Sequence, residues 1–263
     1  ERKPFQTGFR VEHRQEIVDA AIYGASTPRG DRPPADYRVA TRVRDLDLFS
    51  FCMCPGGEII PAIHDLAHMN TNGMSYSKKD SGFANSGIVA TLNPEDFGGD
   101  PDDAFAGVAL QERYEALAAE AIGGTARVPA MRLSDFLAGR KSDALPPGSC
   151  RTGFALAEVG AFVPPRVERA LREGAAALAR QLRGFLAEDA LLVGPESRSS
   201  SPIRLPRNAE TGEAEGIEGL RPAGEGAGYA GGIVSAAVDG LRAAEGVMTR
   251  FGPPRPVVDA RDV

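Results

Sequence analysis

The chain has 263 residues, with 30 Lys and Arg against 36 Asp and Glu, a formal net charge of −6 and 42% hydrophobic residues. This length predicts one large domain or two small ones, and the hydrophobic content suffices for a packed core. The apolar runs are too short for a membrane span or a secretory leader, and the acidic balance argues against nucleic acid as a partner.

The cysteines indicate the compartment. Cys52, Cys54 and Cys150 form an odd and small set that cannot make the disulfide framework of a secreted domain. We therefore expect a cytoplasmic protein.

The first third of the chain predicts a sheet with a short helix. Residues 8–12 read as a strand, 15–23 as a helix that ends at Gly24, and 25–35 as a loop. Alternation over 37–43 predicts another strand, and 48–53 and 58–62 continue the sheet around the turn 54–57. The polar segment 70–86 is expected to be a loop that contacts a ligand, before a strand at 87–92.

The middle of the chain predicts two helices with apolar stripes. One opens at Asp102 and ends at Gly123–Gly124, and the other follows Pro164–Pro165. We expect both stripes to face the core, namely Leu110, Tyr114, Leu117 and Ala121 in the first helix and Leu171, Ala175, Leu178, Leu182 and Phe185 in the second.

The last third leads to the densest motif. Residues 191–193 and 202–205 read as short strands, 208–218 as a surface excursion, 219–223 as a strand, and 252–263 as a surface tail. Between these lies a glycine-rich turn, Gly224-Glu225-Gly226-Ala227-Gly228-Tyr229-Ala230-Gly231-Gly232, followed by a helix that begins at Ile233. Residues without side chains let a ligand approach the backbone, and a helix N-terminus favours an anion or an electron-rich oxygen.

We compared the glycine-rich turn with three known types of nucleotide-binding motif. A P-loop is disfavoured because no Lys occurs in 224–263. Residues 226–231 match Gly-x-Gly-x-x-Gly, but a dinucleotide fingerprint should open a βαβ unit, for which little chain follows. The closing turn of a flavin domain fits better, with Glu225 accepting hydrogen bonds from ribityl hydroxyls. A plain strand-to-helix connection with a solvated Glu225 stays open as the structural alternative.

Motifs spread over the chain resemble one family. They are 8–13, 51–57, 72–75, 84–86, 196–204 and 219–233. Together they resemble the C-terminal part of the uncharacterised bacterial FAD-dependent dehydrogenases, NAD(P)/FAD-dependent oxidoreductases of the glutathione-reductase-like type. The family's N-terminal βαβ unit, with its own glycine fingerprint, has no counterpart here, so we expect this chain to be the C-terminal portion of such a protein.

The resemblance implies an α/β fold, a partial FAD/NAD(P)-binding Rossmann-like domain with an inserted mixed α+β substrate domain. Residues 1–39 and 196–263 would belong to the FAD domain and 40–195 to the insertion. It implies FAD as the cofactor, an unknown small-molecule substrate, and leaves a nicotinamide cofactor open. The expected cofactor-binding residues are Gly224, Glu225, Gly226, Ala227, Gly228, Tyr229, Ala230, Gly231, Gly232, Ile233, Arg198, Ser199, Ser200, Cys54, Pro55, Gly56, Gly57, Asn72 and Ser75.

Cys52 and Cys54 allow two further interpretations. With His64 and His68 they could bind zinc, but Cys-x-Cys running into Pro-Gly-Gly lacks the usual zinc spacing, so we expect no metal. As a redox dithiol they would lie about 6–7 Å apart on a regular strand, too far for a disulfide without local distortion. From another class, the chain could be a non-catalytic nucleotide- or protein-binding module without flavin.

Overall fold

The computed structural model describes residues 1–24 and 30–252, which fall into two compact units. We call the unit made of Pro4–Gly98 and Val108–Ser199 the sheet unit. The unit made of Glu1–Lys3, Gly99–Gly107 and Ser200–Val263 is the C-terminal unit. Each is described by itself.

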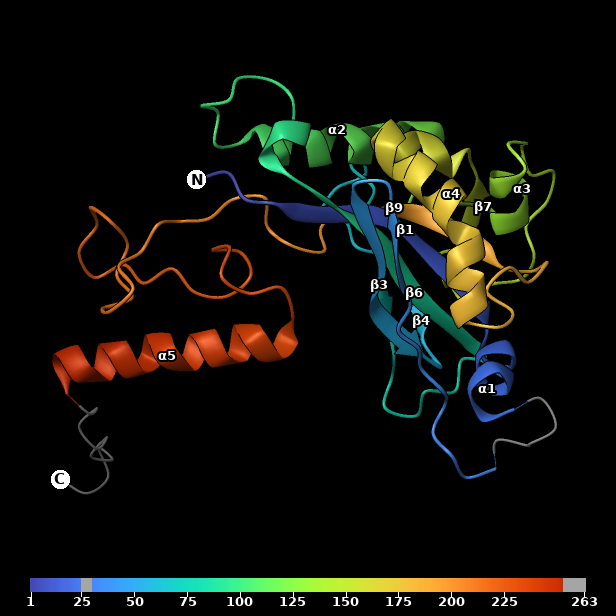
Figure 1. Ribbon diagram of the computed structural model, residues 1–263, viewed down its shortest axis with the longest axis horizontal. Helices are drawn as coiled ribbons and strands as arrows, with labels where there is room; N and C mark the ends of the chain where they lie inside the picture. The colour runs from blue at the N-terminus through green and yellow to red at the C-terminus, as the bar shows by residue number, and fades with distance from the viewer. Residues whose placement is uncertain (25–29, 253–263) are drawn as a thin grey trace. The chain divides into compact units, whose positions relative to one another are not determined.

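The sheet unit is a mixed α/β structure around one seven-stranded sheet of order β2-β3-β6-β1-β9-β7-β8 (Figure 1). The pairing is antiparallel except between β7 and β8. The strands of this sheet are β1 (Phe5–Arg14), β2 (Ala40–Val43), β3 (Leu46–Pro55), β6 (Phe83–Leu92), β7 (Val128–Arg132), β8 (Phe154–Leu156) and β9 (Leu191–Glu196). A two-stranded sheet pairs β4 (Glu58–Pro61) with β5 (Thr71–Met74).

Strand β1 lies in the middle of the sheet and is buried on both faces. It pairs with β6 on one side, with Phe9 opposite Ile88, and with β9 on the other, with Val11 opposite Leu192. Because side chains alternate along a strand, Phe9 lies on one face of β1 and Arg10 on the other. The Phe9 ring packs on Phe136 at a centroid distance of 5.7 Å.

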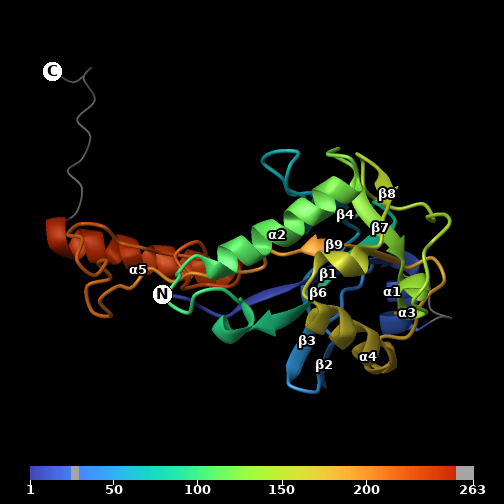
Figure 2. The same cartoon turned by 90° about the horizontal axis from the view of Figure 1, so that it is seen from above.

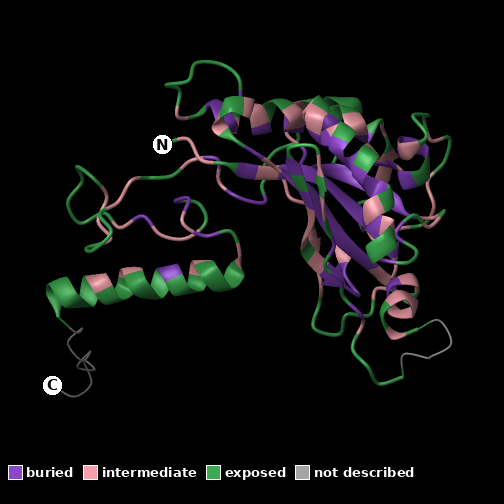
Figure 3. Ribbon diagram, in the orientation of Figure 1, coloured by how far each residue is buried: buried purple, intermediate pink, exposed green. Residues whose placement is uncertain are grey.

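Helices cover the sheet unit, and α4 (Pro165–Gln181) packs against β1, β2, β3 and β6 (Figure 2). Gly174 permits this close approach, since a Cβ there would lie 2.9 Å from Val43 Cγ2. The other helices of this part are α1 (Gln15–Tyr23), α2 (Ala106–Ala121) and α3 (Leu133–Leu137), with 3-10 turns η1 (Pro94–Asp96) and η2 (Val159–Phe162). The central strands β1, β6 and β9 are buried along most of their length (Figure 3).

In the C-terminal unit, α5 (Ile233–Phe251) follows a long stretch of turns. Only Asp239 of α5 is buried among its described residues, and the helix is largely exposed (Figure 3). Arg2 and Ile203 form an isolated bridge, as do Arg207 and Ala214. No helix within residues 1–24 and 30–252 is long and apolar enough to cross a membrane.

The structure confirms several predicted elements and corrects others. The helix 15–23 and its end at Gly24 are confirmed, and the strands at 8–12, 48–53, 87–92 and 191–193 form as parts of longer strands. The strand predicted at 58–62 forms as β4, but it pairs with β5 in a separate sheet and does not continue the main one. The predicted strand 37–43 forms only from Ala40, as β2. The loop predicted over 70–86 is wrong in part, because it contains β5 and the start of β6.

The strand predicted at 202–205 is reduced to the bridge at Ile203, since Pro202 and Pro206 lack N–H donors. Residues 219–223 are turn and coil, so no strand precedes the glycine-rich turn. The loop 25–35 and the tail 252–263 lie partly outside the described residues.

The two predicted helix stripes have different outcomes. Leu171, Ala175 and Leu178 of α4 are buried, as expected, and the predicted Leu182 and Phe185 are buried too but lie beyond the end of the helix at Gln181. The stripe from Leu110 to Ala121 is not the core face, because α2 instead buries Gln111, Glu115, Ala118 and Ala119. The buried face of α2 includes polar side chains that are hydrogen bonded, and the spacing of apolar residues cannot predict such a face.

Candidate functional site

A fully buried arginine organises the sheet unit beside β3. The Arg10 Nε donates to Glu196 Oε2 at 2.7 Å and its Nη2 donates to Glu196 Oε1 at 2.6 Å. Its Nη1 donates to Asn85 Oδ1 at 2.8 Å and to the Cys52 carbonyl at 3.1 Å, and Nη2 also reaches Asn72 Oδ1 at 3.3 Å. Burial alone would lower the pKa of Arg10, but the neighbouring Glu196 raises it by more, so the guanidinium stays protonated. We call these five residues the Arg10 network.

Strand ends and strand pairing position this network. Glu196 is the last residue of β9 and pairs with Gly8 of β1, while Asn85 lies in β6 opposite Cys54 of β3. Gly73 of β5 is needed for close approach, since a Cβ there would lie 2.2 Å from Asn85 Oδ1 and 2.4 Å from Arg10 Nη1.

The structure brings together six predicted cofactor residues around this network: Cys54, Pro55, Gly56, Gly57, Asn72 and Ser75. Ser75 Oγ donates to the Pro55 carbonyl at 2.9 Å, and the Gly56 N–H donates to Gln15 Oε1 at 2.7 Å. A Cβ on Gly57 would lie 2.9 Å from Cys54 Cβ. Contacts within the chain therefore account for much of the choice of residues at these positions.

Arg198 and Ser199, predicted on the flavin side, are engaged inside the sheet unit. Arg198 forms a two-point ion pair with Glu115, with Nε to Oε1 at 2.7 Å and Nη2 to Oε2 at 2.6 Å. Ser199 Oγ donates to the Gln6 carbonyl at 2.7 Å. Ser200 belongs to the C-terminal unit and is buried there. Their part in cofactor binding stays a prediction.

The remaining predicted residues, Gly224–Ile233, form a continuous turn of the C-terminal unit that leads into α5. The turn closes on itself, with the Gly228 N–H donating to the Glu225 carbonyl at 2.9 Å and the Tyr229 N–H to the Gly224 carbonyl at 3.0 Å. A Cβ on Gly226 or Gly231 would meet no atom within 4 Å. Part of the turn thus presents bare backbone to open space.

An ion pair between Arg207 and Asp239 stabilises this turn. Arg207 donates to Asp239 of α5 through Nη2 at 2.6 Å, and Asp239 Oδ2 accepts the Gly224 N–H at 2.8 Å. The guanidinium of Arg207 also lies 3.6 Å from the centre of the Tyr229 ring. Hydrogen bonding from Arg207 lowers the pKa of Asp239, so this carboxylate stays charged.

Glu225 is exposed at the start of the turn, where partial burial raises its pKa and the charge of Lys3 lowers it in part. Its carboxylate accepts no hydrogen bond from the described part of the chain. It is therefore available to an outside donor.

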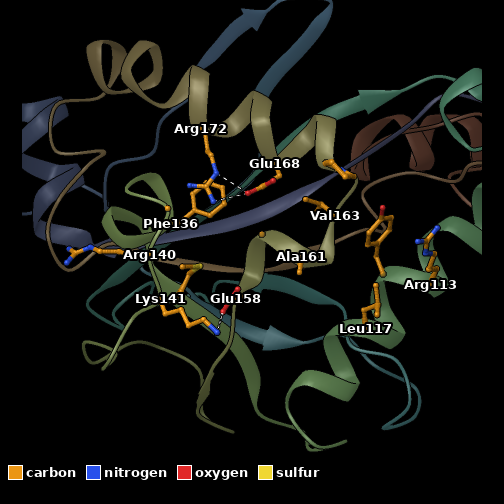
Figure 4. A pocket seen from close by; sticks show the side chains of 15 residues that line it. Arg113, Leu117, Phe136, Arg140, Lys141, Glu158, Ala161, Val163, Glu168 and Arg172 are labelled. Carbon is orange, nitrogen blue, oxygen red and sulfur yellow. Dashed lines mark hydrogen bonds and ion pairs between the residues drawn. The ribbon is translucent and has the colours of Figure 1, made fainter.

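A pocket of about 560 Å³ lies elsewhere in the sheet unit, between α2, α4 and the η2 turn (Figure 4). Arg172 pairs with Glu168 at 2.8 Å and covers the Phe136 ring at 4.0 Å, and Lys141 pairs with Glu158. The volume is that of a small-molecule site. An anionic ligand would compete with these carboxylates for the cations.

The predicted histidine pair is brought together, but without the cysteines. His64 Nε2 lies 3.0 Å from Asp65 Oδ2, and His68 Nδ1 lies 3.1 Å from Asp65 Oδ1. Ligand atoms of these three residues all lie within 4.8 Å of one another, on the surface. Within the described residues, Cys52 and Cys54 do not join this group, so the four-ligand zinc interpretation is not supported.

Sequence reasoning missed Arg10 and Glu196 as a buried pair. A signal for it was present: a cation inside an apolar strand, and an acid that ends another apolar strand. Buried ions of this kind are normally paired with opposite charge.

Comparison with known proteins gives the family. The model of a family described as "FAD-dependent protein, C-terminal domain-like" matches residues 4–199. A protein of Clostridium beijerinckii (strain ATCC 51743 / NCIMB 8052), described as uncharacterized, is 39% identical over 259 residues, which cover 96% of this chain and 48% of that relative. The chain thus spans about half the length of this curated relative. It belongs to the FAD-dependent protein, C-terminal domain-like family.

Proposed function

We propose that this chain supplies the ribityl and isoalloxazine side of the FAD site in an FAD-dependent oxidoreductase. The observation that carries this proposal is the turn Gly224–Gly232, whose backbone faces open space at Gly226 and Gly231 directly before the N-terminus of α5. The family match over residues 4–199 ends before this turn, and it supports FAD as the ligand of the protein to which the turn belongs. Bound FAD would supply hydride transfer, and the protein supplies binding and electrostatics.

The residues of the turn suit a flavin in distinct ways. The carboxylate of Glu225 is an acceptor suited to vicinal hydroxyls of the ribityl chain. The exposed N–H groups at the start of α5 suit the electron-rich oxygen of the pyrimidine ring. Asp239 and Arg207 fix the turn from the protein side, so these groups are held in place before any ligand binds.

The proposed domain arrangement extends to the longer protein. We assign the turn and α5 to an FAD-binding, Rossmann-like domain completed by chain that corresponds to the unmatched half of the relative. We assign substrate binding to the sheet unit. The substrate and any nicotinamide partner are unidentified.

Flavin occupancy of the full-length protein tests this proposal. After reconstitution with FAD, Gly226→Val should lower occupancy because its side chain would fill space that the chain itself leaves empty. Glu225→Gln should lower it through loss of the ionised acceptor. Gly240→Ala and Glu245→Gln, exposed on α5, are the matched controls and should bind FAD as wild type does.

The outcomes separate the candidate functions. Equal occupancy and equal absorption spectra in all four variants would refute the assignment of the turn. A wild-type protein that takes up no flavin would instead favour a nucleotide- or protein-binding module without FAD.

A further inference from the structure

The two cysteines of β3 lie where the pairing of β3 with β6 is irregular. The register with β6 pairs Phe51 with Gly87 and Cys54 with Asn85, so three steps along β3 match two along β6. Cys52 takes up the extra residue with φ 45°, a left-handed conformation that costs energy outside glycine and is common at functional sites. This is a β-bulge. It supplies the local distortion that a regular strand lacks.

The bulge changes what the two thiols can contact. Cys52 is exposed and Cys54 is buried, and the Cys54 thiol donates to the Cys52 carbonyl at 3.4 Å. The first thiol is open to a reactant and the second stands directly behind it.

Two glycines make room for the Cys54 side chain. A Cβ on Gly73 would lie 2.9 Å from Cys54 Sγ, and one on Gly57 would lie 2.9 Å from Cys54 Cβ. Larger residues at either position would displace the thiol. Cys150 is the internal contrast, because it is buried in a cluster with Ile59 and Val128 and has no neighbouring thiol there.

Charged groups around the bulge favour a thiolate at Cys52. Arg10 of β1 and Glu196 of β9 are the ionised neighbours, and Asn72 and Asn85 are neutral. The hydrogen bond from Cys54, followed by the charge of Arg10, lowers the pKa of Cys52 to about 6, against the effects of burial and of Glu196. The same hydrogen bond raises the pKa of Cys54, as does burial. Reactive cysteines occupy partly exposed, electropositive surroundings of this type.

We propose that Cys52 and Cys54 form a thiol–disulfide redox pair in which Cys52 attacks the disulfide of another molecule and Cys54 resolves the product. In the first step the Cys52 thiolate forms a mixed disulfide and releases one thiolate of the reactant. That thiolate takes the proton of Cys54, and Cys54 then attacks Cys52 Sγ and releases the second thiolate. The protein pair is oxidised by two electrons and the reactant disulfide is reduced to one thiol and one thiolate.

This exchange requires no flavin, so it stands apart from the proposed FAD site. Glutathione disulfide is the probe. The full chain is equilibrated in buffers of glutathione and glutathione disulfide, quenched with acid, and cleaved after methionine with cyanogen bromide. Because Met53 separates the two cysteines, fragments that end at Met53 and begin at Cys54 stay joined only when the disulfide has formed.

Three variants make the test specific. Wild type should give joined fragments that separate on return to glutathione. Cys54→Ala should stop at a lasting glutathione adduct on Cys52, Cys52→Ala should give neither product, and Cys150→Ala should behave as wild type. Absence of joined fragments in wild type, or an adduct on Cys54→Ala no more persistent than on wild type, would overturn the proposal.

Alkylation of Cys52 by iodoacetamide gives an independent readout. Its rate should rise with a midpoint near pH 6 in wild type and shift upward in Cys54→Ala, which lacks the donor thiol. A wild-type midpoint at the unperturbed cysteine value of about 8.5, unchanged in the variant, would count against the pair.

Discussion

Glu12 is a buried carboxylic acid whose protonation should govern how stability depends on pH. It lies in β1 with 2% of its surface exposed, and its Oε1 accepts the Ser149 N–H at 3.0 Å. Ser149 Oγ donates to the other carboxylate oxygen and accepts the Ile59 N–H at 2.8 Å. Burial raises the pKa of Glu12 to about 7, and the hydrogen bonds from Ser149 offset only part of that effect.

The magnitude follows from linkage between protonation and folding. Below pH 4.5 the carboxyl is protonated in both states, so no stability is lost there. As the pH rises from 4.5 to about 7, the unfolded chain releases the proton while the folded chain keeps it, and stability falls. At roughly 1.36 kcal/mol for each pH unit, the loss reaches about 3 kcal/mol above pH 7.

Glu12→Gln removes the titration while keeping the size and one amide oxygen of the side chain. The free energy of unfolding of the variant, minus that of wild type, should increase by about 2–3 kcal/mol from pH 5 to pH 8. Urea titrations followed by far-ultraviolet circular dichroism measure it, since the chain has no Trp for fluorescence. Glu16→Gln, exposed on α1, is the control and should show no such change. A difference for Glu12→Gln that is equal at the two pH values would refute the reasoning.

Two further predictions concern the Arg10 network. Glu196→Gln leaves a buried guanidinium without its counter-charge and should lower the free energy of unfolding by about 3–5 kcal/mol in urea titrations at neutral pH, whereas a loss below about 1 kcal/mol would mean that the pair is dispensable. Gly73→Ala places a Cβ 2.2 Å from Asn85 Oδ1 and should cost about 1–3 kcal/mol, while Gly226→Ala, whose Cβ meets nothing within 4 Å, should stay within about 0.5 kcal/mol. Equal melting temperatures for these two glycine variants would contradict the packing argument.

The sequence predicted those elements that have local features such as a glycine at the helix end or apolar residues at helical spacing. The helix 15–23 has its glycine end, with Gly24 at φ 95°, and the stripe of α4 repeats at helical spacing. Strand β5, Thr71–Met74, was missed because its residues are polar or small, and pairing with β4 rather than propensity holds it extended. Strands β7 and β8 were missed for a related reason, since both are short and are set by pairing across the sheet.

Several members of the candidate site were predictable from sequence motifs, but Arg10, Glu196 and the contacts among the residues were not. Cys54, Gly57 and Asn72 were singled out as motif residues, yet nothing in their spacing indicates that they surround Arg10. The bulge at Cys52 was equally hidden, because a β-bulge depends on the register with the neighbouring strand β6. Long-range pairing therefore decided whether two cysteines at i and i+2 could touch.

The glycines of the two predicted clusters have different physical reasons. Gly57 and Gly73 are required by the protein itself, since any side chain would collide with Cys54 or Asn85. Gly226 and Gly231 are not, because a Cβ at either would enter empty space. A packing constraint explains the first pair completely and leaves the second unexplained within the described chain. Gly228 of the second cluster also has a packing reason, since a Cβ there would lie 2.4 Å from the Ile203 carbonyl oxygen. Gly226 and Gly231 point instead to a molecule outside the chain, which is why Gly226→Val is a sharper test of FAD binding than any substitution at residues 54–57.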